Sequence, residues 1–317
     1  MQFLAFRHRL GYAVARKSAL YAYRELDQFM TFRGLSRPDQ INEAFAANWM
    51  FSIPRHSSRT KNKRLILLRG FCRYLVRLGR LTEDPTRRIP YLRNKPSPPP
   101  HLYSLKELEA MLQVAYRWTR RHNHRFPAWV LAAFIHLLYA CGLRLSEALN
   151  LKLKDIDFEE NTLSLWKTKF HKERLVPFSQ KTADRLSYFL YRRSRRYPGQ
   201  CGHEDFVFCH KRGKYSSVGM FYLFRRLVRE AGLAKARGPR IHDLRHTFAV
   251  HRLYKWYQEG ADPLNKISYL STYMGHVNIE ETQVYLTITR AMLREGDKRF
   301  SAFFENVAKK RLPRLSQ

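Results

Sequence analysis

Six side chains in the last two-thirds of the sequence are of the types needed to break and remake a phosphodiester bond. The last of them, Tyr285, follows His276 by nine residues. A phenol can attack phosphorus if a nearby base or positive charge helps it to ionise, because its ordinary pKa is about 10. The set therefore predicts cleavage through a tyrosyl ester. In chain order the six are Arg144, Lys169, His242, Arg245, His276 and Tyr285.

Arg144 and Arg245 are the candidates for holding the phosphate. Attack at phosphorus builds a five-coordinate transition state with extra charge on the non-bridging oxygens, and a guanidinium fork can bind two oxygens at once. Each arginine stands at a predicted helix boundary, Arg144 in CGLRLSEAL and Arg245 in HDLRH. Most single arginines in so basic a chain are simply exposed, so it is their context that distinguishes these two.

Two histidines accompany the arginines. His242 and Arg245 are three residues apart at the start of a predicted helix, so their side chains share one face. Neutral His242 could accept the proton of the nucleophile, and His276, which follows Gly275, could donate a hydrogen bond to a phosphate oxygen. His246 is expected to point away from this face and to have a structural role.

Lys169 is the candidate general acid. The 5′-oxygen of the broken bond leaves poorly unless it is protonated, and a lysine on a hairpin turn between two predicted strands can deliver that proton. Lys167 and Lys172 lie beside the same turn and remain alternatives. Two other tyrosines, Tyr269 and Tyr273, are better explained by packing on the preceding helix.

A second group of reactive side chains could suggest zinc, but its spacing matches no common structural site. Its members are Cys201, His203, Cys209 and His210. No cluster of carboxylates suits two Mg²⁺ ions, and no glycine-rich loop suits a nucleotide phosphate. We therefore expect no metal and no cofactor. A tyrosyl ester conserves the energy of the broken bond, so that rejoining needs no ATP.

The 317 residues suffice for two domains, and the chain carries a net charge of +33, from 59 basic and 26 acidic side chains. Residues 1–100 contribute +14 and the remainder +19, so both halves would present a positive surface to a polyanion. The charge alone also fits an RNA-binding or ribosome-associated protein, but no aromatic-rich RNA-binding motif is found. No apolar stretch reaches the ~20 residues that span a bilayer, and we expect a cytoplasmic, nucleoid-associated protein.

The first domain, residues 1–95, is predicted to be helical. Apolar spacing predicts helices at Ser18–Phe32, Pro38–Met50 and Ser58–Gly79. The third carries seven basic residues on one face and no acidic partner, which favours contact with the DNA backbone. The DNA-binding candidates among the seven are Lys61, Lys63, Arg64, Arg69 and Arg73.

A proline-rich linker, residues 96–103, leads to the second domain, residues 104–317. Ser104 and Glu107 form a capping box that starts a helix. Helices at 104–118, 127–141 and Ser146–Leu149 are followed by a small antiparallel sheet of Asp155–Phe158, Thr162–Trp166 and Arg174–Phe178. The remainder is expected to be helical at 180–195, 217–231, 243–258, 265–274, 278–286 and 290–309, with a short strand at Phe206–Phe208.

These ordered motifs resemble the catalytic boxes of the tyrosine recombinase, or phage integrase, family. They are GLRLSEAL, the hairpin before KERLVPF, HDLRHTFA and GHVNIEETQVY, over roughly residues 104–290. The resemblance departs from the family's Gly-Lys-Gly turn, which is Thr168-Lys169-Phe170 here, and in a longer segment between HDLRH and Gly275. It implies that Arg144, Lys169, His242, Arg245 and His276 activate the phosphate, that Tyr285 is the nucleophile and that Glu147 supports the first arginine.

The resemblance also implies a fold and a function. The fold would be mainly α with a small antiparallel β-sheet, in a helical core-binding domain and a catalytic domain. The function would be site-specific DNA recombination for a transposon or integrative element, or for resolving chromosome dimers, by a tetramer on two double-stranded sites, alone or beside sister recombinases. Two alternatives remain open: a type IB topoisomerase-like nicking and closing enzyme, and a DNA-binding regulator without catalysis.

Overall fold

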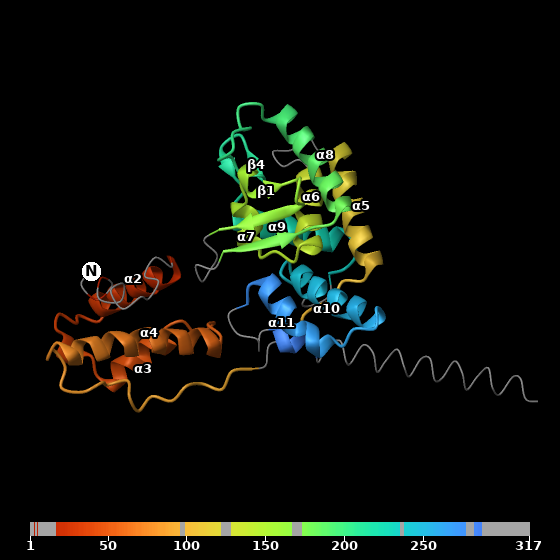
Figure 1. Ribbon diagram of the computed structural model, residues 1–317. Coiled ribbons are helices and arrows are strands. Elements are labelled where there is room, and N and C mark those ends of the chain that lie inside the picture. The colour runs from red at the N-terminus through yellow and green to blue at the C-terminus, as the bar shows by residue number, and fades with distance from the viewer. Residues whose placement is uncertain are drawn as a thin grey trace, which may run out of the picture. The chain divides into compact units, whose positions relative to one another are not determined.

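The computed structural model describes residues 17–95, 99–121, 128–166, 173–234, 238–276 and 282–286, together with Phe3 and Ala5. The chain divides into two compact units, Met1–Pro98 and Pro99–Gln317 (Figure 1). The division falls inside the predicted linker at 96–103. Most of the described residues are helical and the strands form two small antiparallel sheets, which confirms the mainly helical fold class.

Unit 1 is built on one long helix, α4 (Ser58–Arg77), which packs against α2 (Lys17–Phe32) and α3 (Glu43–Phe51). Leu65 and Leu68 on α4 are fully buried, and so is Trp49 on α3. Leu65 and Leu68 are three positions apart, so α4 turns one apolar stripe toward its neighbours and leaves its other faces to water.

The predicted helix Pro38–Met50 is wrong at its start. Pro38–Gln40 forms a single 3₁₀ turn (η1), after which Ile41 has extended backbone angles. The Asn42 side chain then accepts a hydrogen bond from the Phe45 N–H at 2.8 Å and caps α3. An asparagine at this position satisfies a free N–H of a new helix, so the segment starts again rather than continuing.

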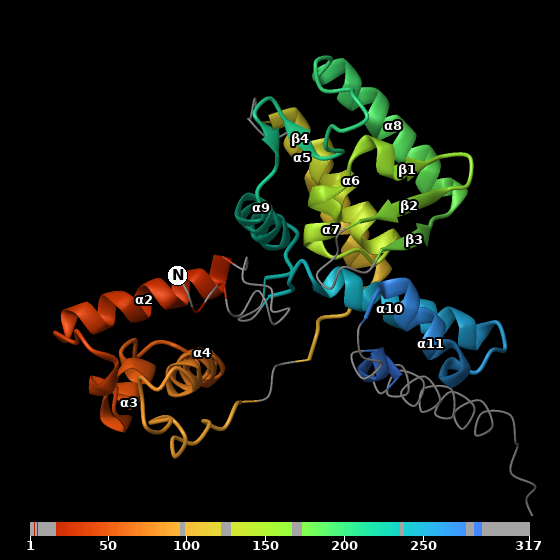
Figure 2. The same ribbon diagram turned by 60° about the vertical axis from the view of Figure 1, so that its left-hand side comes forward.

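Unit 2 is organised around α6 (Ala128–Ala140), which packs against α5 (Leu105–Arg121), α8 (Gln180–Arg196) and α10 (Asp243–Gln258) (Figure 2). Since α6 is apolar on nearly every side, neighbours can cover it all round. The capping box predicted before α5 is present: Ser104 N–H donates to Glu107 Oε2 at 2.7 Å, and Glu107 N–H donates to Ser104 Oγ at 3.2 Å. The remaining helices are α7 (Leu145–Asn150), η2 (Leu153–Asp155), α9 (Ser217–Glu230) and α11 (Pro263–Met274).

The three-stranded sheet has the order β1-β2-β3 and is antiparallel throughout. Its strands are β1 (Ile156–Asp157), β2 (Thr162–Leu165) and β3 (Arg174–Pro177). Leu163 pairs with Val176, and both are completely buried, so one face of the sheet covers the helical core. The segment 167–172, which joins β2 to β3, lies outside the described residues.

The predicted strand Phe206–Phe208 is wrong. The strands here are β4 (Cys209–His210) and β5 (Gly213–Lys214), and Phe206 makes only an isolated bridge to Lys152. The reason is Arg193. Its buried guanidinium donates hydrogen bonds to the carbonyls of Phe206 at 2.7 Å and Val207 at 3.0 Å. Those carbonyls are bound to a side chain and are not used in a strand ladder.

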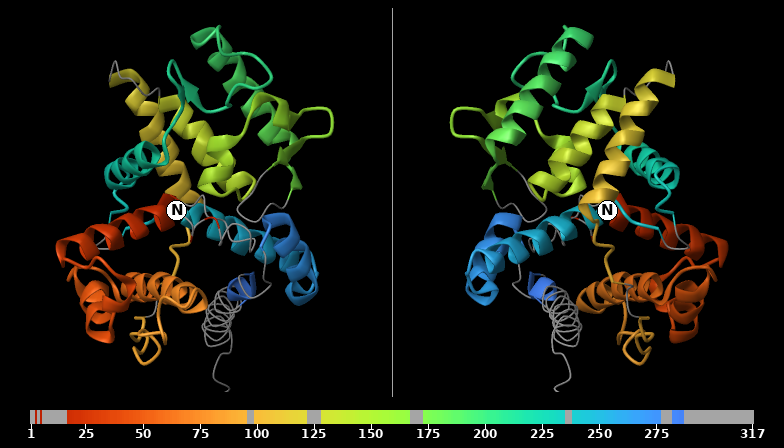
Figure 3. Two further views of the ribbon diagram at one scale, coloured as in Figure 1. Left: turned by 90° about the vertical axis from the view of Figure 1, so that its left-hand side faces the viewer. Right: turned by 90° about the vertical axis from the view of Figure 1, so that its right-hand side faces the viewer.

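Helices α10 and α11 lie side by side (Figure 3). They enclose a smaller apolar cluster. Phe248 and Leu253 from α10 meet Leu270 and Met274 from α11 there, and Tyr285 belongs to the same cluster. The end of α11 therefore lies close to the residue predicted to be the nucleophile. None of the helices within the described ranges is both long and apolar enough to cross a membrane.

Gly142, between α6 and α7, allows the closest approach in this part of the core. Its φ is +60°, and an added Cβ would lie 2.4 Å from the ring of Phe248, which is 6% exposed. Gly142→Ala should lower the free energy of unfolding by about 3 kcal/mol, through left-handed backbone strain and overpacking together.

Gly232→Ala is the matched control for urea unfolding. Its φ is +73°, but an added Cβ meets no atom within 4 Å, as far as the structure is described. It should cost only about 1 kcal/mol, because backbone strain alone remains. Equal losses in the two variants would show that the Phe248 ring does not restrict this position.

Candidate active site

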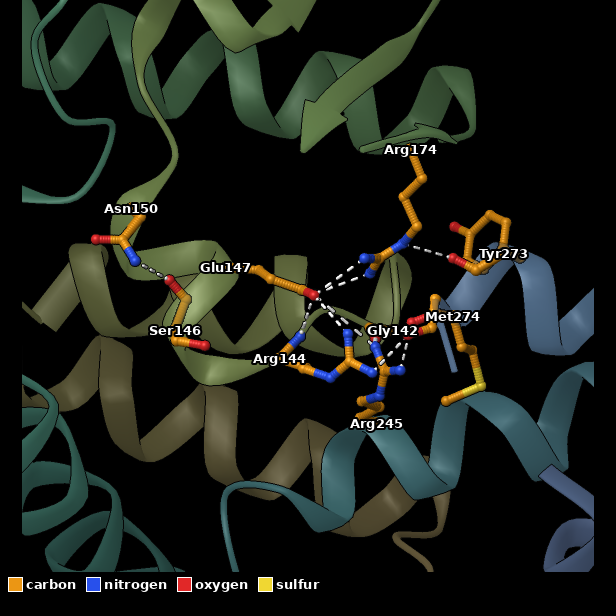
Figure 4. Close-up of polar contacts among 10 residues, drawn as sticks. Gly142, Arg144, Ser146, Glu147, Asn150, Arg174, Arg245, Tyr273 and Met274 are labelled. Carbon is orange, nitrogen blue, oxygen red and sulfur yellow. Dashed lines mark hydrogen bonds and ion pairs between the residues drawn. The ribbon is translucent and has the colours of Figure 1, made fainter. Parts of the chain in front are cut away.

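Three arginines converge on the C-terminal end of α11 (Figure 4). They come from three different elements, the start of α7, the start of β3 and the first turn of α10. A helix leaves its last carbonyls without partners and has negative potential at that end, so cations are stabilised there. The donors are Arg174 Nε to the Tyr273 carbonyl at 2.8 Å, Arg245 Nη2 to Met274 at 2.5 Å and Arg144 Nη2 to Gly275 at 2.7 Å.

The carboxylate of Glu147 lies among these three guanidiniums. Arg174 binds it with two parallel hydrogen bonds of 3.0 and 2.9 Å, and Arg144 donates to it from Nη1 and from its backbone N–H, each at 2.8 Å. Arg245 Nη1 lies 3.9 Å away. Burial alone would raise the pKa of Glu147, but the hydrogen bonds and charge of Arg174, with help from Arg144 and Arg245, lower it to about 2. Glu147 is therefore fully ionised at neutral pH.

Arg245 is more deeply buried than Arg144. Its side chain is 2% exposed and also donates to the Gly142 carbonyl at 2.6 Å. Desolvation, and then the charge of Arg144, lower the pKa of Arg245 to about 10, so that it remains a cation at neutral pH. The Arg144 side chain is 16% exposed. One carboxylate against three guanidiniums leaves an excess of positive charge, which suits an anionic ligand.

His276 follows this cluster directly. Its backbone N–H closes the end of α11 on the Ser271 carbonyl, and its Nδ1 lies 2.6 Å from Thr282 Oγ1. Desolvation, followed by the charges of Arg245, Arg144 and Arg174, lowers the pKa of His276 to about 3. The imidazole is therefore neutral at pH 7. If Thr282 donates to Nδ1, then Nε2 carries the remaining hydrogen and can donate it to a ligand oxygen.

Tyr285 contacts a histidine that the sequence analysis set aside. His246 Nδ1 lies 2.8 Å from Tyr285 Oη, so the expectation that His246 points away is wrong. The tyrosine comes from a segment 39 residues further on, so the spacing of residues within α10 does not show which of them it contacts. Desolvation lowers the pKa of His246, so its ring is predominantly neutral at pH 7.

His242 lies next to His246. The two imidazoles pack edge to face with centroids 4.8 Å apart. Although part of His242 is exposed, desolvation, followed by His246 and Arg245, lowers its pKa to about 4. The ring of His276 lies 6.3 Å from that of Tyr285. His246 is thus hydrogen-bonded to the tyrosine, the ring of His276 lies near it, and His242 packs on His246.

The tyrosine itself is 1% exposed and packs in the cluster between α10 and α11. The two tyrosines upstream differ from each other. Tyr273 stacks on Phe248 with centroids 5.4 Å apart and donates to the Pro177 carbonyl, which agrees with the packing role expected of it. Tyr269 is 67% exposed, so packing does not explain it.

Lys169 lies outside the described residues, and so do its alternatives Lys167 and Lys172. The described strands flanking them, β2 and β3, are antiparallel partners with Leu165 opposite Arg174. The sequence proposal that a lysine on this turn is the general acid therefore stays a prediction.

The basic residues predicted to contact DNA on α4 have different surroundings. Arg64 is 4% exposed, stacks on Trp49 and donates to Ser52 Oγ at 2.9 Å. The guanidinium of Arg69 donates hydrogen bonds to Thr86, Ile89 and Tyr91. These bonds hold the segment after α4 against that helix. This geometry speaks against a phosphate contact by Arg64 or Arg69. Lys63 and Arg73 are exposed, and Lys61 is half-buried.

Two site residues were missed by the sequence analysis, Arg174 and His246. Each lies inside a motif that had been noticed, Arg174 in KERLVPF and His246 in HDLRH. A signal existed for Arg174, since a charged residue that begins a strand beside a predicted general acid could face the same site. Among the described residues, no group of three or more His, Cys, Asp or Glu side chains is arranged to hold a metal ion.

Known proteins and a family model are similar to this chain over most of its length. The family model named Phage integrase family matches residues 105–292. The protein y4rB of Sinorhizobium fredii (strain NBRC 101917 / NGR234), named as an integrase/recombinase, is 32% identical over 314 residues, which cover 96% of each chain. The tyrosine recombinase XerC of Bacillus subtilis (strain 168) is 32% identical over 246 residues, 75% of this chain and 73% of that protein. The chain belongs to the phage integrase family, which confirms the family and the class of DNA strand-transferring enzyme expected from the motifs.

Solved structures show the same fold. The Tn1549 transposon integrase in complex with a circular intermediate DNA superposes with a TM-score of 0.65 at 19% identity, over 93% of this chain and 98% of that one. A lambda integrase dimer bound to a COC′ core site gives a TM-score of 0.60 at 16% identity, over 88% and 95%.

The hydrogen bond between His246 and Tyr285 should be measurable as a coupling in stability. His246→Phe and Tyr285→Phe each remove one partner and leave the other polar group in a half-buried site, at a cost of about 1–3 kcal/mol. The double variant should be less destabilised than the sum of the two by about 1 kcal/mol, as urea unfolding of all four proteins would show. Additive losses would mean that the two side chains do not interact in solution.

Proposed function

We propose that this protein is a site-specific DNA recombinase that cuts and rejoins strands through a 3′-phosphotyrosyl link at Tyr285. The observation that carries the proposal is the convergence at one helix end. Arg144, Arg245 and His276 meet there, and the Tyr285 hydroxyl is hydrogen-bonded to the residue next to Arg245. Cations that can hold a phosphate and a nucleophile that can attack it thus lie in one site.

The arginines stabilise the charge that develops at phosphorus. In this proposal Arg144 and Arg245 bind the non-bridging oxygens of the scissile phosphate, and His276 donates a further hydrogen bond. Both guanidiniums are fixed by backbone carbonyls before DNA arrives. Donors that are fixed in advance need no reorganisation as charge develops, which is the largest source of rate enhancement in sites of this kind.

Two protons must move for the exchange to proceed. As Tyr285 Oη bonds to phosphorus its proton passes to a histidine, and the hydrogen bond at 2.8 Å favours His246 over His242 for that role. The bond from phosphorus to the 5′-oxygen breaks, and Lys169 supplies the proton that makes it a free 5′-hydroxyl. The 5′-hydroxyl of a partner strand then gives its proton to Lys169 and attacks phosphorus, and the bond from phosphorus to Tyr285 Oη breaks as His246 returns the proton to the phenol. Neither a metal ion nor a nucleotide enters these steps.

The partner is double-stranded DNA, and the proposal extends to the assembly. Both halves of the chain are strongly basic, +14 and +19, so each can contact the phosphate backbone. On α4 the exposed side chains of Lys63 and Arg73 are the candidates. Because the proposed reaction exchanges strands between two duplexes, we expect a homotetramer on two recombination sites, alone or beside a sister recombinase. Because the partner is DNA, we expect the protein to be associated with the nucleoid in the cytoplasm.

Replacing Tyr285 by phenylalanine tests the nucleophile. A phenyl ring cannot attack phosphorus, so Tyr285→Phe should form no protease-sensitive covalent adduct with labelled DNA, while its affinity for DNA stays within roughly twofold of wild type. The assay is run with EDTA in excess, which should leave the wild-type yield unchanged.

Tyr269→Phe is the matched control, since that tyrosine is exposed on α11 and should keep the wild-type yield. An adduct of normal yield from Tyr285→Phe would move the nucleophile elsewhere. Cleavage abolished by EDTA and restored by Mg²⁺ would contradict the chemistry proposed here. Nicking and closing of one duplex without exchange between two would favour the topoisomerase-like alternative.

A sulfur substitution tests the general acid. Lys169→Ala should slow cleavage by roughly 10²–10⁴, the range for a lost general acid. A substrate with sulfur as the bridging 5′ atom has a leaving group that scarcely needs a proton. It should restore cleavage by Lys169→Ala but not by Arg245→Ala, whose defect lies at the non-bridging oxygens. Rescue of Lys172→Ala or Lys167→Ala in place of Lys169→Ala would assign the acid to that neighbour.

A further inference from the structure

Arg174, the first residue of β3, is part of the arginine cluster but is not positioned to bind DNA. We propose that Arg174 is a positioning residue for strand cleavage: it holds Glu147 and the end of α11 so that Arg144 and Arg245 stay available to the phosphate. This inference rests on the proposed function and adds a residue to it.

The contacts of Arg174 use all three of its nitrogens. Nη1 and Nη2 bind the two oxygens of Glu147 at 3.0 and 2.9 Å, and Nε donates to the Tyr273 carbonyl at 2.8 Å. The side chain is 9% exposed. The guanidinium binds both oxygens of one carboxylate and one backbone carbonyl, so we expect its effect on cleavage to pass through these partners.

The first of those effects is electrostatic. Glu147 is buried and ionised, and Arg174 donates a hydrogen bond to each of its two carboxylate oxygens. Without Arg174 the same negative charge would be balanced by Arg144, already at 2.8 Å, and by Arg245, at 3.9 Å. The carboxylate would then compete with the phosphate for the two guanidiniums that have to stabilise the transition state.

The second effect is geometric. Arg174 packs so closely on Gly275 that an added Cβ there would lie 2.7 Å from Nη1, and Gly275 has a φ of +65°. The carbonyl of Gly275 orients Arg144, and the following residue is His276. Arg174 thus sets the distance between β3 and the turn at Gly275. This turn orients two proposed phosphate ligands, Arg144 through the Gly275 carbonyl and His276 as the next residue. A displacement of about 1 Å at such a site can cost roughly 10²-fold in rate.

Two substitutions separate charge from geometry. Arg174→Gln removes the cation and should slow single-turnover cleavage by roughly 10²-fold. Arg174→Lys keeps the charge but cannot bind both oxygens in parallel, and should slow it by roughly tenfold. Since Arg174 does not reach the phosphate, DNA affinity should change by less than roughly threefold in both. Arg226→Gln, which breaks the ion pair of Arg226 with Glu230 on α9, is the matched control and should cleave at the wild-type rate.

The substrate charge distinguishes positioning from a general loss of structure. A methylphosphonate at the scissile position lacks one charged non-bridging oxygen, so it depends less on the arginines. The defect of Arg174→Gln should shrink on this substrate by roughly tenfold or more, as should that of Arg144→Ala.

Wild type is measured beside every variant, so that failure of the positioning role can be distinguished from failure of the proposed function. A defect of equal size on phosphate and methylphosphonate would overturn the positioning role. So would cleavage by Arg174→Lys and Arg174→Gln within twofold of wild type. If Arg174→Gln does not fold, as judged by urea unfolding, Arg174→Lys is compared on the two substrates in its place. A wild-type protein that forms no adduct would instead overturn the proposed function.

Discussion

The buried carboxylate of Glu147 is the constraint on which the rest of the site depends. Three guanidiniums from the starts of α7, β3 and α10 cannot be brought together in a protein interior without a negative charge between them and carbonyls to receive their hydrogen bonds. The end of α11 supplies those carbonyls from three successive residues, Tyr273, Met274 and Gly275. One acid and one helix terminus thus hold cations that would otherwise repel one another, and the excess of positive charge that remains is what a phosphate can neutralise.

The same concentration of charge governs the histidines. Their pKa values are lowered first by desolvation and then by neighbouring cations, to about 4 at His242 and about 3 at His276. All three rings are therefore available in the neutral form, which can accept one proton or donate another according to its tautomer. The arginines bind charge while the histidines handle protons. This division of roles follows from the pKa of a guanidinium, which stays far above neutral even at Arg245.

Much of the fold could be predicted, because it rests on local rules. Apolar spacing placed α2, α4, α8 and α10 to within one or two residues, and the capping box at Ser104 and Glu107 placed the start of α5. The errors came where a side chain competes for the backbone. Asn42 caps a new helix within the segment predicted as one helix, and Arg193 takes the carbonyls of a predicted strand. Such competition depends on which groups are close in the folded structure, and hydrophobic periodicity does not predict it.

By itself the sequence determined the inventory of the site: two arginines, two histidines and a tyrosine in a fixed order, with Glu147 three residues after Arg144. The pairing of His242 with Arg245 was accessible because residues three apart share a helix face, and Glu147 followed from the resemblance to the family's motif. The tertiary structure alone decided that Arg64 lies inside unit 1, that Arg174 joins the cluster from 27 residues beyond Glu147 and that His246 meets Tyr285 across 39 residues. Contacts of that range are set by how α6, α10, α11 and the sheet pack on one another, and packing is a property of all their side chains together.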